Sequence, residues 1–414
     1  MPKLEFENLE FRELEDKAGK GKGERIEVTL LKNFFFYIGK KDMEKIGDHT
    51  IGRNFIEFKG IDEKKAAGRF NLLISEGIKS LKNRLNSKPA VYIHRNSGIP
   101  LIGSLFFGIV DRGSTIVEVK PLTSCNLNCM FCSVDEGISG RKETDFVVEE
   151  EYLVDELRKL LEFKKSTEIE VFINPHGEPL LYADIVKLVK DIKEIKYVKK
   201  VAIITNGALL TEKLVDDLEK AGLDQLNLSV NSLDDRNSRI IAGTKEYDIT
   251  KIKKIMEYIT SKERRRKLSL VVAPVWVPGV NDKDIKEIAE YCNKAGCSTG
   301  IQKYVRHKKG RNPQNVEEMD WPGFFRELEQ LEGETGKGPL IKGPGKTPEL
   351  PRPFRTGEIV KAKLVCPGRL SNEGIAVFRQ RAITVYGCGS RIGEPVNIKL
   401  IKSKNNIFFG KCLG

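Results

Sequence analysis

The alternation of apolar and polar positions is most regular between Thr115 and about Leu331. Six short β-branched runs recur there, separated by segments with apolar residues at helical spacing, such as Glu149–Phe163 and Thr211–Ala221. This pattern predicts β/α units that form a parallel sheet with right-handed crossovers. Six units, where a closed barrel has eight, predict an α/β fold with a partial (β/α)6 barrel over 115–332. Its functional groups are expected at the carboxyl ends of the strands.

The segments that flank this stretch have different patterns. Residues 1–24 are charged from the third residue and predict a polar tail, whereas 25–114 combine strand-like runs with one helical pattern and predict a small α/β unit. Residues 333–357 contain five of the 17 prolines, which predicts an extended linker. Residues 358–414 hold five short strand-like runs, which predict a small five-stranded β-barrel of the OB type.

The charge distribution adds a candidate partner. The formal net charge is +12, and residues 358–414 contain ten Lys and Arg against three Glu. A Lys- and Glu-rich thermophile surface is the alternative for the whole chain, but it would not concentrate the excess in one segment. OB barrels bind nucleic acid through a basic groove and exposed aromatic rings. The aromatic candidates, some of which must fill the barrel instead, are Phe378, Tyr386, Phe408 and Phe409.

The chain carries no sign of a membrane or export route. It has no apolar run of about 18 residues, and its first residues lack the apolar centre of a signal peptide. We therefore expect a cytoplasmic protein with no membrane partner. Cysteines are normally reduced in that compartment, so clustered cysteines indicate metal binding or catalysis.

Three of the eight cysteines lie within eight positions, in TSCNLNCMFCSVDEG, directly after the first predicted strand. Three thiolates in one loop can hold three corners of a [4Fe–4S] cube and leave the fourth iron open to a substrate. A structural zinc site is the alternative, but it requires a fourth ligand, and none follows at that spacing. The predicted cluster ligands are Cys125, Cys129 and Cys132.

With this CxxxCxxC motif, the sequence resembles the radical S-adenosylmethionine (SAM) superfamily over about Thr115–Leu331. The resemblance implies a [4Fe–4S] cluster and SAM as cofactors, and it extends to TNGALL, LSVNS and VPGVND after later strands. The SAM contacts that it implies are Phe131 beside the adenine, Gly177 and Glu178 at the amino group, and Ser229 and Asn231 at the carboxylate or ribose.

The implied SAM contacts depart from the family at one position and have structural alternatives. His176 of HGEP stands where the family's GGEP has its first Gly, although Gly177 and Glu178 remain. Glu178 can also be read as a surface residue at a helix start, and Ser229 and Asn231 as strand-end caps. In the family, SAM is cleaved to a 5′-deoxyadenosyl radical that takes a hydrogen atom from the substrate, while the protein supplies binding and excludes water.

The C-terminal segment resembles the TRAM domain, a five-stranded RNA-binding module, with IGEPVNIKL the closest stretch. Together the two resemblances imply a transferase that modifies tRNA or rRNA and takes electrons from a cytosolic donor. A methylthiotransferase would carry a second cluster on three N-terminal cysteines, but no cysteine precedes Cys125. The reaction type therefore stays open.

The remaining cysteines and the other function classes also stay open. Cys366, Cys388 and Cys412 lie in the predicted barrel and are candidates for an auxiliary metal or cluster, with buried thiols as the alternative. Cys412 is in addition a candidate catalytic carrier, because some ribosomal RNA methylases use a cysteine near the C-terminus. The alternative functions are a radical SAM enzyme acting on a small molecule, lipid or peptide, and a non-catalytic RNA-binding protein that contains a cluster.

Overall fold

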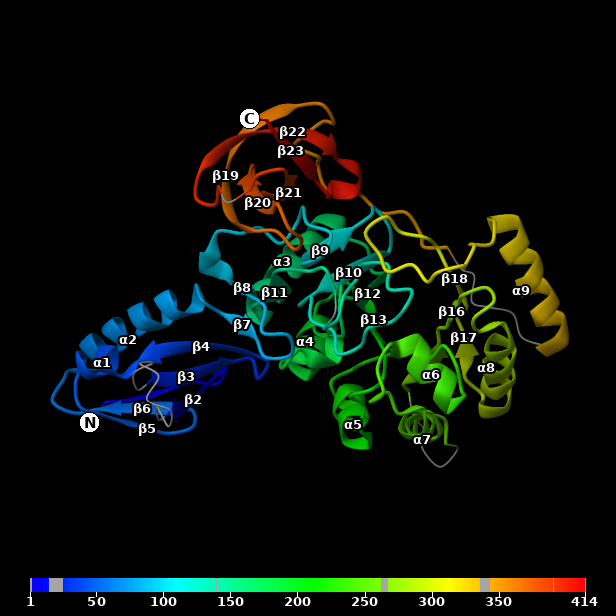
Figure 1. Cartoon of the computed structure of the whole chain (residues 1–414), viewed down its shortest axis with the longest axis horizontal. Coiled ribbons are helices and arrows are strands. Elements are labelled where there is room, and N and C mark those ends of the chain that lie inside the picture. Colours follow the sequence, from blue (N-terminus) through cyan, green and yellow to red (C-terminus); the bar gives the residue numbers. More distant parts are fainter. Residues whose placement is uncertain are drawn as a thin grey trace. The chain divides into compact units, whose positions relative to one another are not determined.

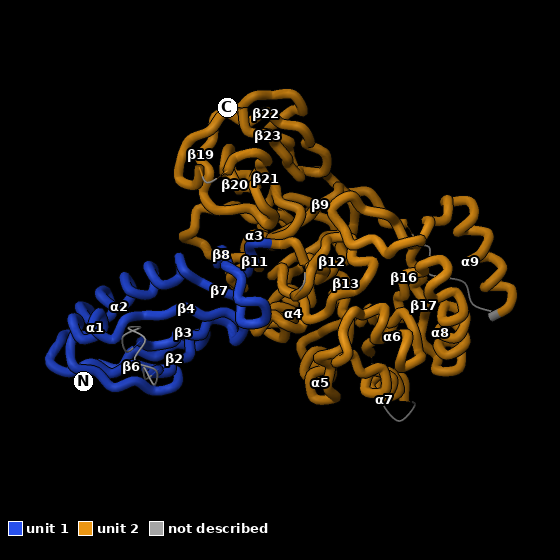
Figure 2. Tube along the Cα trace, viewed as in Figure 1, with its two compact units in different colours: residues 1–93, 143–147 blue, residues 94–142, 148–414 orange. Residues whose placement is uncertain are grey.

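A computed structural model describes residues 2–14, 25–138, 140–261, 267–335, 343–389 and 391–413 (Figure 1). The chain divides into two compact units (Figure 2). Unit 1 comprises Met1–Ile93 with Glu143–Val147, and unit 2 comprises His94–Lys142 with Val148–Gly414. Within the described ranges, no helix has both the length and the apolar character needed to cross a membrane.

Unit 1 contains two small antiparallel sheets and two helices. The three-stranded sheet has the order β1 (Lys3–Glu5), β6 (Phe55–Phe58), β5 (His49–Ile51). The four-stranded sheet has the order β2 (Leu9–Leu14), β3 (Arg25–Leu30), β4 (Phe34–Gly39), β7 (Lys82–Asn83). The helices are α1 (Lys40–Glu44) and α2 (Glu63–Ile78), and β8 (Ala90–Ile93) pairs with β11 (Asp145–Val148).

The prediction of a polar tail over residues 1–24 was wrong for its described part, because residues 3–5 and 9–14 form β1 and β2. Leu9 and Phe11 alternate with charged residues and point into the core of unit 1, where the Phe11 ring packs edge-on against Phe70 of α2. The many charges of this segment lie on the opposite face of a half-buried strand. Residues 15–24 lie outside the described residues.

The centre of unit 2 is a seven-stranded sheet with six parallel strands. Five of them lie in the predicted β-branched runs, whereas the sixth run, at 299–305, reaches this sheet only at Thr299 and otherwise contains β18 (Gln302–Lys303) of a separate two-stranded sheet. The order of the seven-stranded sheet, β17-β15-β14-β13-β12-β10-β9, follows the chain without interruption, and only β9 is antiparallel to its neighbour. The predicted partial barrel of consecutive β/α units is therefore confirmed. The strands are β9 (Gly108–Asp111), β10 (Ile116–Lys120), β12 (Ile169–Ile173), β13 (Val198–Thr205), β14 (Gln225–Leu228), β15 (Ser269–Val272) and β17 (Ser298–Thr299).

Amphipathic helices connect these strands, and several begin at a side-chain cap. Thr211 accepts a hydrogen bond from Leu214 N at the start of α5, and Asp248 accepts one from Lys251 N at the start of α7. The two helical stretches taken from the sequence pattern correspond to α3 and α5. The helices are α3 (Glu150–Lys164), α4 (Ile185–Lys193), α5 (Glu212–Lys220), α6 (Asp235–Ala242), α7 (Ile249–Thr260), α8 (Asp282–Ala295) and α9 (Trp321–Thr335). The shorter elements are β16 (Val275–Trp276), β18 (Gln302–Lys303), η1 (Arg95–Ser97), η2 (Pro179–Leu181) and η3 (Lys404–Asn406).

The C-terminal segment is a closed five-stranded barrel, as predicted. Strand β19 alternates inward residues such as Val360 and Leu364 with outward lysines, which is the pattern of a sheet buried on one face. The order is β19 (Ile359–Pro367), β20 (Glu373–Phe378), β21 (Arg381–Tyr386), β23 (Phe409–Leu413), β22 (Pro395–Lys402), and β22 closes on β19.

The predicted extended linker, residues 333–357, is only partly free of regular structure in its described residues. Helix α9 runs into its first residues, and 336–342 lie outside the described residues. Described residues 343–357 contain no helix or named strand, although Lys346 makes a single β-bridge to Ser114.

Backbone hydrogen bonds attach the barrel to the rest of unit 2. Ala382 N donates to Ile102 O (3.0 Å) and Phe408 N donates to Gly103 O (2.9 Å). Gly103 has φ +126°, and a Cβ there would lie 2.1 Å from Ala382 O, so the approach requires glycine.

Candidate active site

The three cysteines lie in the loop after β10, at the carboxyl end of the parallel sheet, and all three line one cavity of about 390 Å³. The loop is held by its own turns and by α6, because Asn128 N donates to Ala242 O and Met130 N to Ile241 O, both at 3.0 Å. The remaining predicted site residues line the same cavity: Phe131, Gly177, Glu178, Ser229 and Asn231. The fold thus gathers residues from the ends of β10, β12 and β14 at one place.

The three cysteines are partly buried, and burial and neighbouring thiols raise the pKa of two of them. Burial and, to a smaller extent, the nearby Cys132 raise the pKa of Cys129 to about 12. Burial and the neighbouring Cys129 raise the pKa of Cys125 well above its usual range. Sulfur donors whose charges repel in a low-dielectric cavity suit a positively charged partner such as iron. The donor set therefore fits an iron–sulfur cluster.

Glu178 is a firmly held buried carboxylate at the end of β12. It is 1% exposed and accepts hydrogen bonds from Thr205 Oγ1 (2.6 Å), Asn206 N (2.8 Å) and Leu180 N (3.0 Å). Burial raises its pKa to about 7, although these bonds pull in the other direction. A buried carboxylate in this position can accept hydrogen bonds from an amino group. The alternative of a surface glutamate is wrong.

Gly177 lets the HGEP segment reach the cysteine loop. Glu178 N donates to Ser124 O at 2.7 Å, and a Cβ on Gly177 would lie 2.2 Å from the same oxygen. Any larger residue at this position would therefore separate β12 from the loop that carries Cys125.

Ser229 and Asn231 follow β14, and the side chain of Asn231 is already hydrogen-bonded within the protein. Asn231 Oδ1 accepts a hydrogen bond from Val275 N (2.8 Å), and its Nδ2 donates to Ser229 O (3.3 Å). Asn231 therefore has the strand-end role considered as its alternative, while it also lines the cavity. Phe131 packs beside a small apolar cluster that includes Tyr304.

Comparison with known proteins identifies the family. The model of the radical SAM superfamily matches residues 119–292, which contain the cysteine loop, the end of β10 and all of β12, β13, β14 and β15. The uncharacterised protein MJ0103 of Methanocaldococcus jannaschii is 34% identical over 382 residues, 85% of this chain and 87% of its own length. This chain belongs to the radical SAM superfamily. Enzymes of the superfamily use a [4Fe–4S] cluster and SAM, as the sequence predicted.

More distant relatives match only part of this radical SAM chain. GTP 3′,8-cyclase of Clostridium botulinum is 31% identical over 205 residues, which are 48% of this chain and 59% of that enzyme. Among solved structures, Streptococcus suis SuiB bound to S-adenosylmethionine aligns with 66% of this chain and 52% of its own, with 16% identity and a TM-score of 0.40. The chain thus spans about half of each of these two proteins.

Sequence reasoning missed some residues of the radical SAM cavity. Tyr247 lines it from the segment between α6 and α7, and its hydroxyl donates to Asn206 O at 3.3 Å. Asn206 lines it as well, and its amide donates to Asn126 Oδ1 at 2.9 Å. Asn206 belongs to the TNGALL run, which the sequence resemblance included without assigning a function to any of its residues. No motif near Tyr247 indicated a role in the site.

The barrel cysteines do not form a second centre. Cys366, Cys388 and Cys412 are all buried, and the latter two belong to the apolar core of the barrel. Among the described residues, no group of three or more His, Cys, Asp and Glu is drawn together tightly enough to hold a metal ion. This applies to the loop cysteines as well, but those line one shared cavity. In the barrel, burial alone raises the pKa of Cys366 to about 12, whereas burial and the nearby Cys412 raise the pKa of Cys388, so only two of the three barrel thiols influence each other. The buried-thiol alternative is favoured for the barrel.

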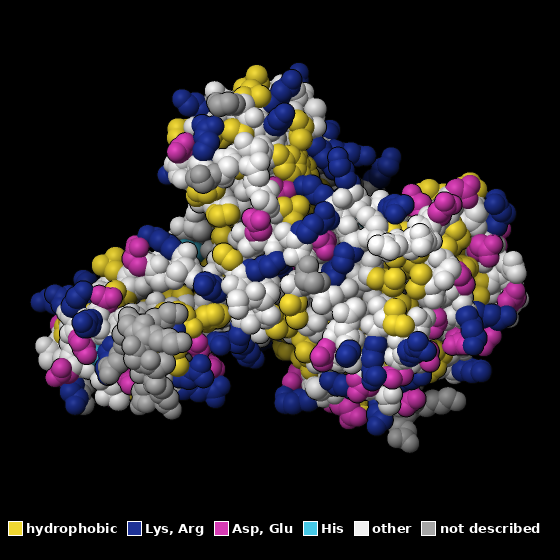
Figure 3. All heavy atoms as spheres, viewed as in Figure 1, with side chains coloured by type: hydrophobic (Ala, Val, Ile, Leu, Met, Phe, Trp, Pro, Cys, Tyr) yellow, Lys and Arg dark blue, Asp and Glu magenta, His cyan; other side chains and the backbone are white. Residues whose placement is uncertain are grey.

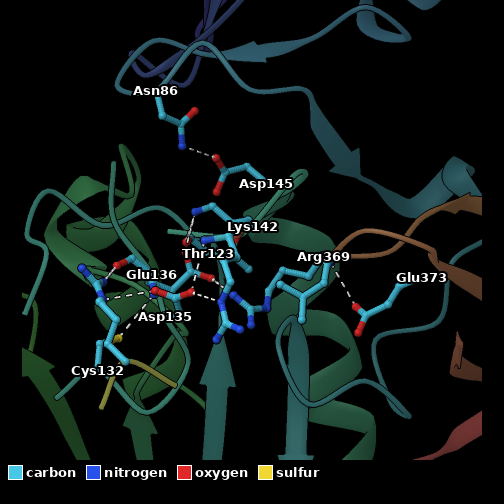
Figure 4. A network of polar contacts seen from close by, with 12 residues as sticks. Asn86, Thr123, Cys132, Asp135, Glu136, Lys142, Asp145, Arg369 and Glu373 are labelled. Atoms are coloured by element: carbon cyan, nitrogen blue, oxygen red, sulfur yellow. Dashed lines mark hydrogen bonds and ion pairs between the residues drawn. The ribbon is translucent and has the colours of Figure 1, made fainter. Parts of the chain in front are cut away.

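A buried ionic junction joins the cysteine loop to the barrel (Figure 4). Glu136 N donates to Cys132 Sγ (3.3 Å), and the Glu136 carboxylate forms ion pairs with Lys142 and with Arg369 Nη1 of the barrel (2.8 Å). The side chains of Glu136, Lys142 and Arg369 are 1%, 0% and 6% exposed. Lys142 Nζ also donates to Thr123 O at 2.9 Å. Charges this deep require their partners.

Proposed function

We propose that this radical SAM enzyme modifies RNA, most specifically tRNA, and that its C-terminal barrel holds the RNA. The observation that carries the proposal is the basic outer face of the barrel. Alternation along the strands places Lys361 and Lys363 of β19 outward, as it does Lys399 of β22 and Lys411 of β23. Figure 3 shows more Lys and Arg than Asp and Glu side chains on the visible face of this barrel.

Two lysines of this outer face lie close enough to repel each other. Lys399 and Lys411 are directly opposite in the register of β22 and β23. Like charges in opposite positions of neighbouring strands destabilise a sheet. Within the described residues, neither these two nor Lys361 and Lys363 take part in an ion pair. A row of uncompensated cations suits the phosphate backbone of a nucleic acid.

The cavity residues have separate tasks in the proposed reaction. Cys125, Cys129 and Cys132 hold the cluster, which when bound supplies the electron that cleaves SAM. Glu178 accepts hydrogen bonds from the SAM amino group, and its own three hydrogen bonds keep it in position. Phe131 provides an apolar face beside the adenine.

The remaining cavity residues, Ser229 and Asn231, border the SAM carboxylate and ribose.

The first experiment measures the salt dependence of tRNA binding. We expect each phosphate contact that is lost to reduce the slope of log K against log salt by about 0.7–0.9. The double variant Lys399→Gln/Lys411→Gln should therefore lower it by about 1.4–1.8. The matched control is Lys213→Gln/Lys283→Gln, which removes the same charge from the exposed faces of α5 and α8 and should leave the slope unchanged.

The second experiment measures 5′-deoxyadenosine formed from SAM and dithionite by the reconstituted protein, with and without tRNA. We expect product, and more of it with tRNA. If neither condition gives product, the chain is a non-catalytic protein. If the salt-dependence slope of tRNA binding is the same in Lys399→Gln/Lys411→Gln as in the control Lys213→Gln/Lys283→Gln, the barrel does not bind RNA.

A free nucleotide is the second candidate substrate, favoured by the partial similarity to GTP 3′,8-cyclase. That enzyme's name states a nucleotide substrate, and the shared region is about half of this chain. The lysine variants separate the two candidates. An enzyme for free nucleotides keeps its full SAM cleavage with GTP when the barrel lysines are neutralised, whereas an RNA enzyme loses tRNA-stimulated cleavage.

A further inference from the structure

Unit 2 contains a second cavity, of about 360 Å³, where the barrel meets the loops of the radical SAM core. Pockets for small organic groups start at about 300 Å³. Ser133, Val134 and His307 line both this cavity and the one that holds the cysteines, so the two are adjacent. None of the activities proposed so far uses it.

One wall of this cavity is aromatic, and charged residues of both signs border it, since Lys309 forms an ion pair with Glu373 at 2.7 Å and Lys402 lies beside the wall without lining the cavity. Tyr386 of β21 and Phe409 of β23 lie with their ring centroids 5.8 Å apart and their planes within 9° of parallel, and both residues are half-buried. Lys309 Nζ lies 4.2 Å from the centroid of the Tyr386 ring, and Lys402 Nζ lies 5.5 Å from that of Phe409. Nucleotides fit such a wall, because the base stacks on a ring while a neighbouring cation meets the phosphate.

Two polar atoms of the lining have no partner. In the described part of the chain, five buried side-chain N or O atoms make no hydrogen bond, and two of them, Thr384 Oγ1 and His176 Nδ1, belong to residues that line this cavity. Thr384 is 1% exposed. An unsatisfied buried polar group is destabilising, and such a group in the wall of a cavity is consistent with a ligand that supplies the missing partner.

The second of these residues, His176, is also where the sequence departs from the GGEP motif of its family. Burial lowers the pKa of His176 well below its ordinary value, and the charges of Lys120 and Arg369 lower it further, so the imidazole is neutral. A neutral imidazole can donate or accept a hydrogen bond according to its tautomer, as the edges of nucleobases require.

We propose that this cavity binds a nucleobase that has left the stack of a bound RNA. The base stacks on Tyr386 and Phe409, its edge meets Thr384 and His176, and its nucleotide extends past His307 toward the SAM cavity. This inference rests on the proposed function and adds to it the group that the enzyme selects. A base that leaves the stack loses stacking and pairing energy, which stacking on the two rings and hydrogen bonding in the cavity replace.

Ultraviolet crosslinking of bulk tRNA to the full-length holoenzyme, followed by mass spectrometry, tests the placement. We expect crosslinked peptides that contain Tyr386 or Phe409. Phe409→Leu should weaken tRNA binding about fivefold or more, because it removes a stacking face. The matched control is Phe378→Leu, a half-buried barrel ring that stacks on Phe354 outside the cavity and should change binding less than about twofold.

A second variant guards against a folding defect. Thr384→Val keeps the side-chain shape and removes a hydroxyl that has no partner, so its thermal midpoint should equal or exceed that of the parent. Its affinity for tRNA should nevertheless fall, by about threefold or more.

The outcomes separate the two proposals. If tRNA binds but the crosslinks lie elsewhere and Phe409→Leu matches Phe378→Leu, the base pocket is wrong and the proposed function stands. If the parent chain binds no tRNA, both fail. In a further arm, AMP, GMP, CMP and UMP compete with tRNA for the crosslink. A mononucleotide that crosslinks to Tyr386 or Phe409 while tRNA does not would overturn the RNA source of the base.

Discussion

Removal of the Glu136 carboxylate should destabilise the cysteine loop far more than removal of its partner Arg369. In Glu136→Gln, the buried cations of Lys142 and Arg369 both lose this shared carboxylate, and breaking a buried pair in this way costs about 3–5 kcal/mol. In Arg369→Met, the Glu136–Lys142 pair remains and only one charge-assisted hydrogen bond is lost. Such a bond contributes about 1.5–3 kcal/mol, and the new apolar side chain offsets part of that loss.

Native-state hydrogen exchange of the segment 123–142, read by mass spectrometry on the holoenzyme, measures this difference. A local probe is preferable because a chain of several parts does not unfold in two states. Asp217→Asn is the control, because it breaks the exposed pair with Lys213 and should change the opening free energy by less than about 0.5 kcal/mol.

Two results would refute the reasoning about this junction. If Arg369→Met costs as much as Glu136→Gln, Lys142 does not compensate the buried carboxylate. If both variants cost less than about 1 kcal/mol, water reaches the junction and its charges are screened.

Three further variants test the cavity. Cys129→Ser should lower iron content and visible absorbance sharply, whereas Cys412→Ser should leave both unchanged, as elemental analysis will show. Gly177→Ala should abolish SAM binding in equilibrium dialysis, since its Cβ would meet Ser124 O at 2.2 Å. Because burial raises the pKa of Glu178 to about 7, the folded cluster-free protein binds more protons than the unfolded chain between about pH 4.5 and 7. The thermal midpoint should therefore fall as pH rises through this window. The thermal midpoint of Glu178→Gln should not show this fall. If the midpoints of the parent protein and of this variant depend equally on pH, the raised pKa of Glu178 is not the cause.

Local patterns predicted the elements of unit 2 because each carries its own periodicity. The β-branched runs gave five of the six parallel strands, and crossover geometry then placed their carboxyl ends together. The cysteine motif located the cavity for the same reason, since its residues are neighbours in the chain. The strands at residues 3–14 escaped prediction because their charged alternate positions suggested a solvated tail.

Long-range pairings left no comparable signal in the sequence. Arg369 and Glu136 are 233 positions apart, and nothing beside either residue indicates that it is buried or paired. The stacked pair Tyr386 and Phe409 was among the aromatic candidates, but Phe408 turned out to fill the barrel core. Which rings face a ligand depends on strand register, which the pattern leaves open.

The Glu136 junction also decides how the role of the barrel is best tested. The Glu136 carboxylate accepts a hydrogen bond from Arg369 of the barrel, and the backbone N–H of Glu136 donates one to Cys132 Sγ. Deleting the barrel would therefore remove one partner of a buried charge four residues from a cluster ligand. A truncated chain that loses activity has two explanations, a lost RNA surface and a disturbed cysteine loop. Substitutions on the outer face, such as Lys399 and Lys411, change the first without touching the second, so they are the informative experiment.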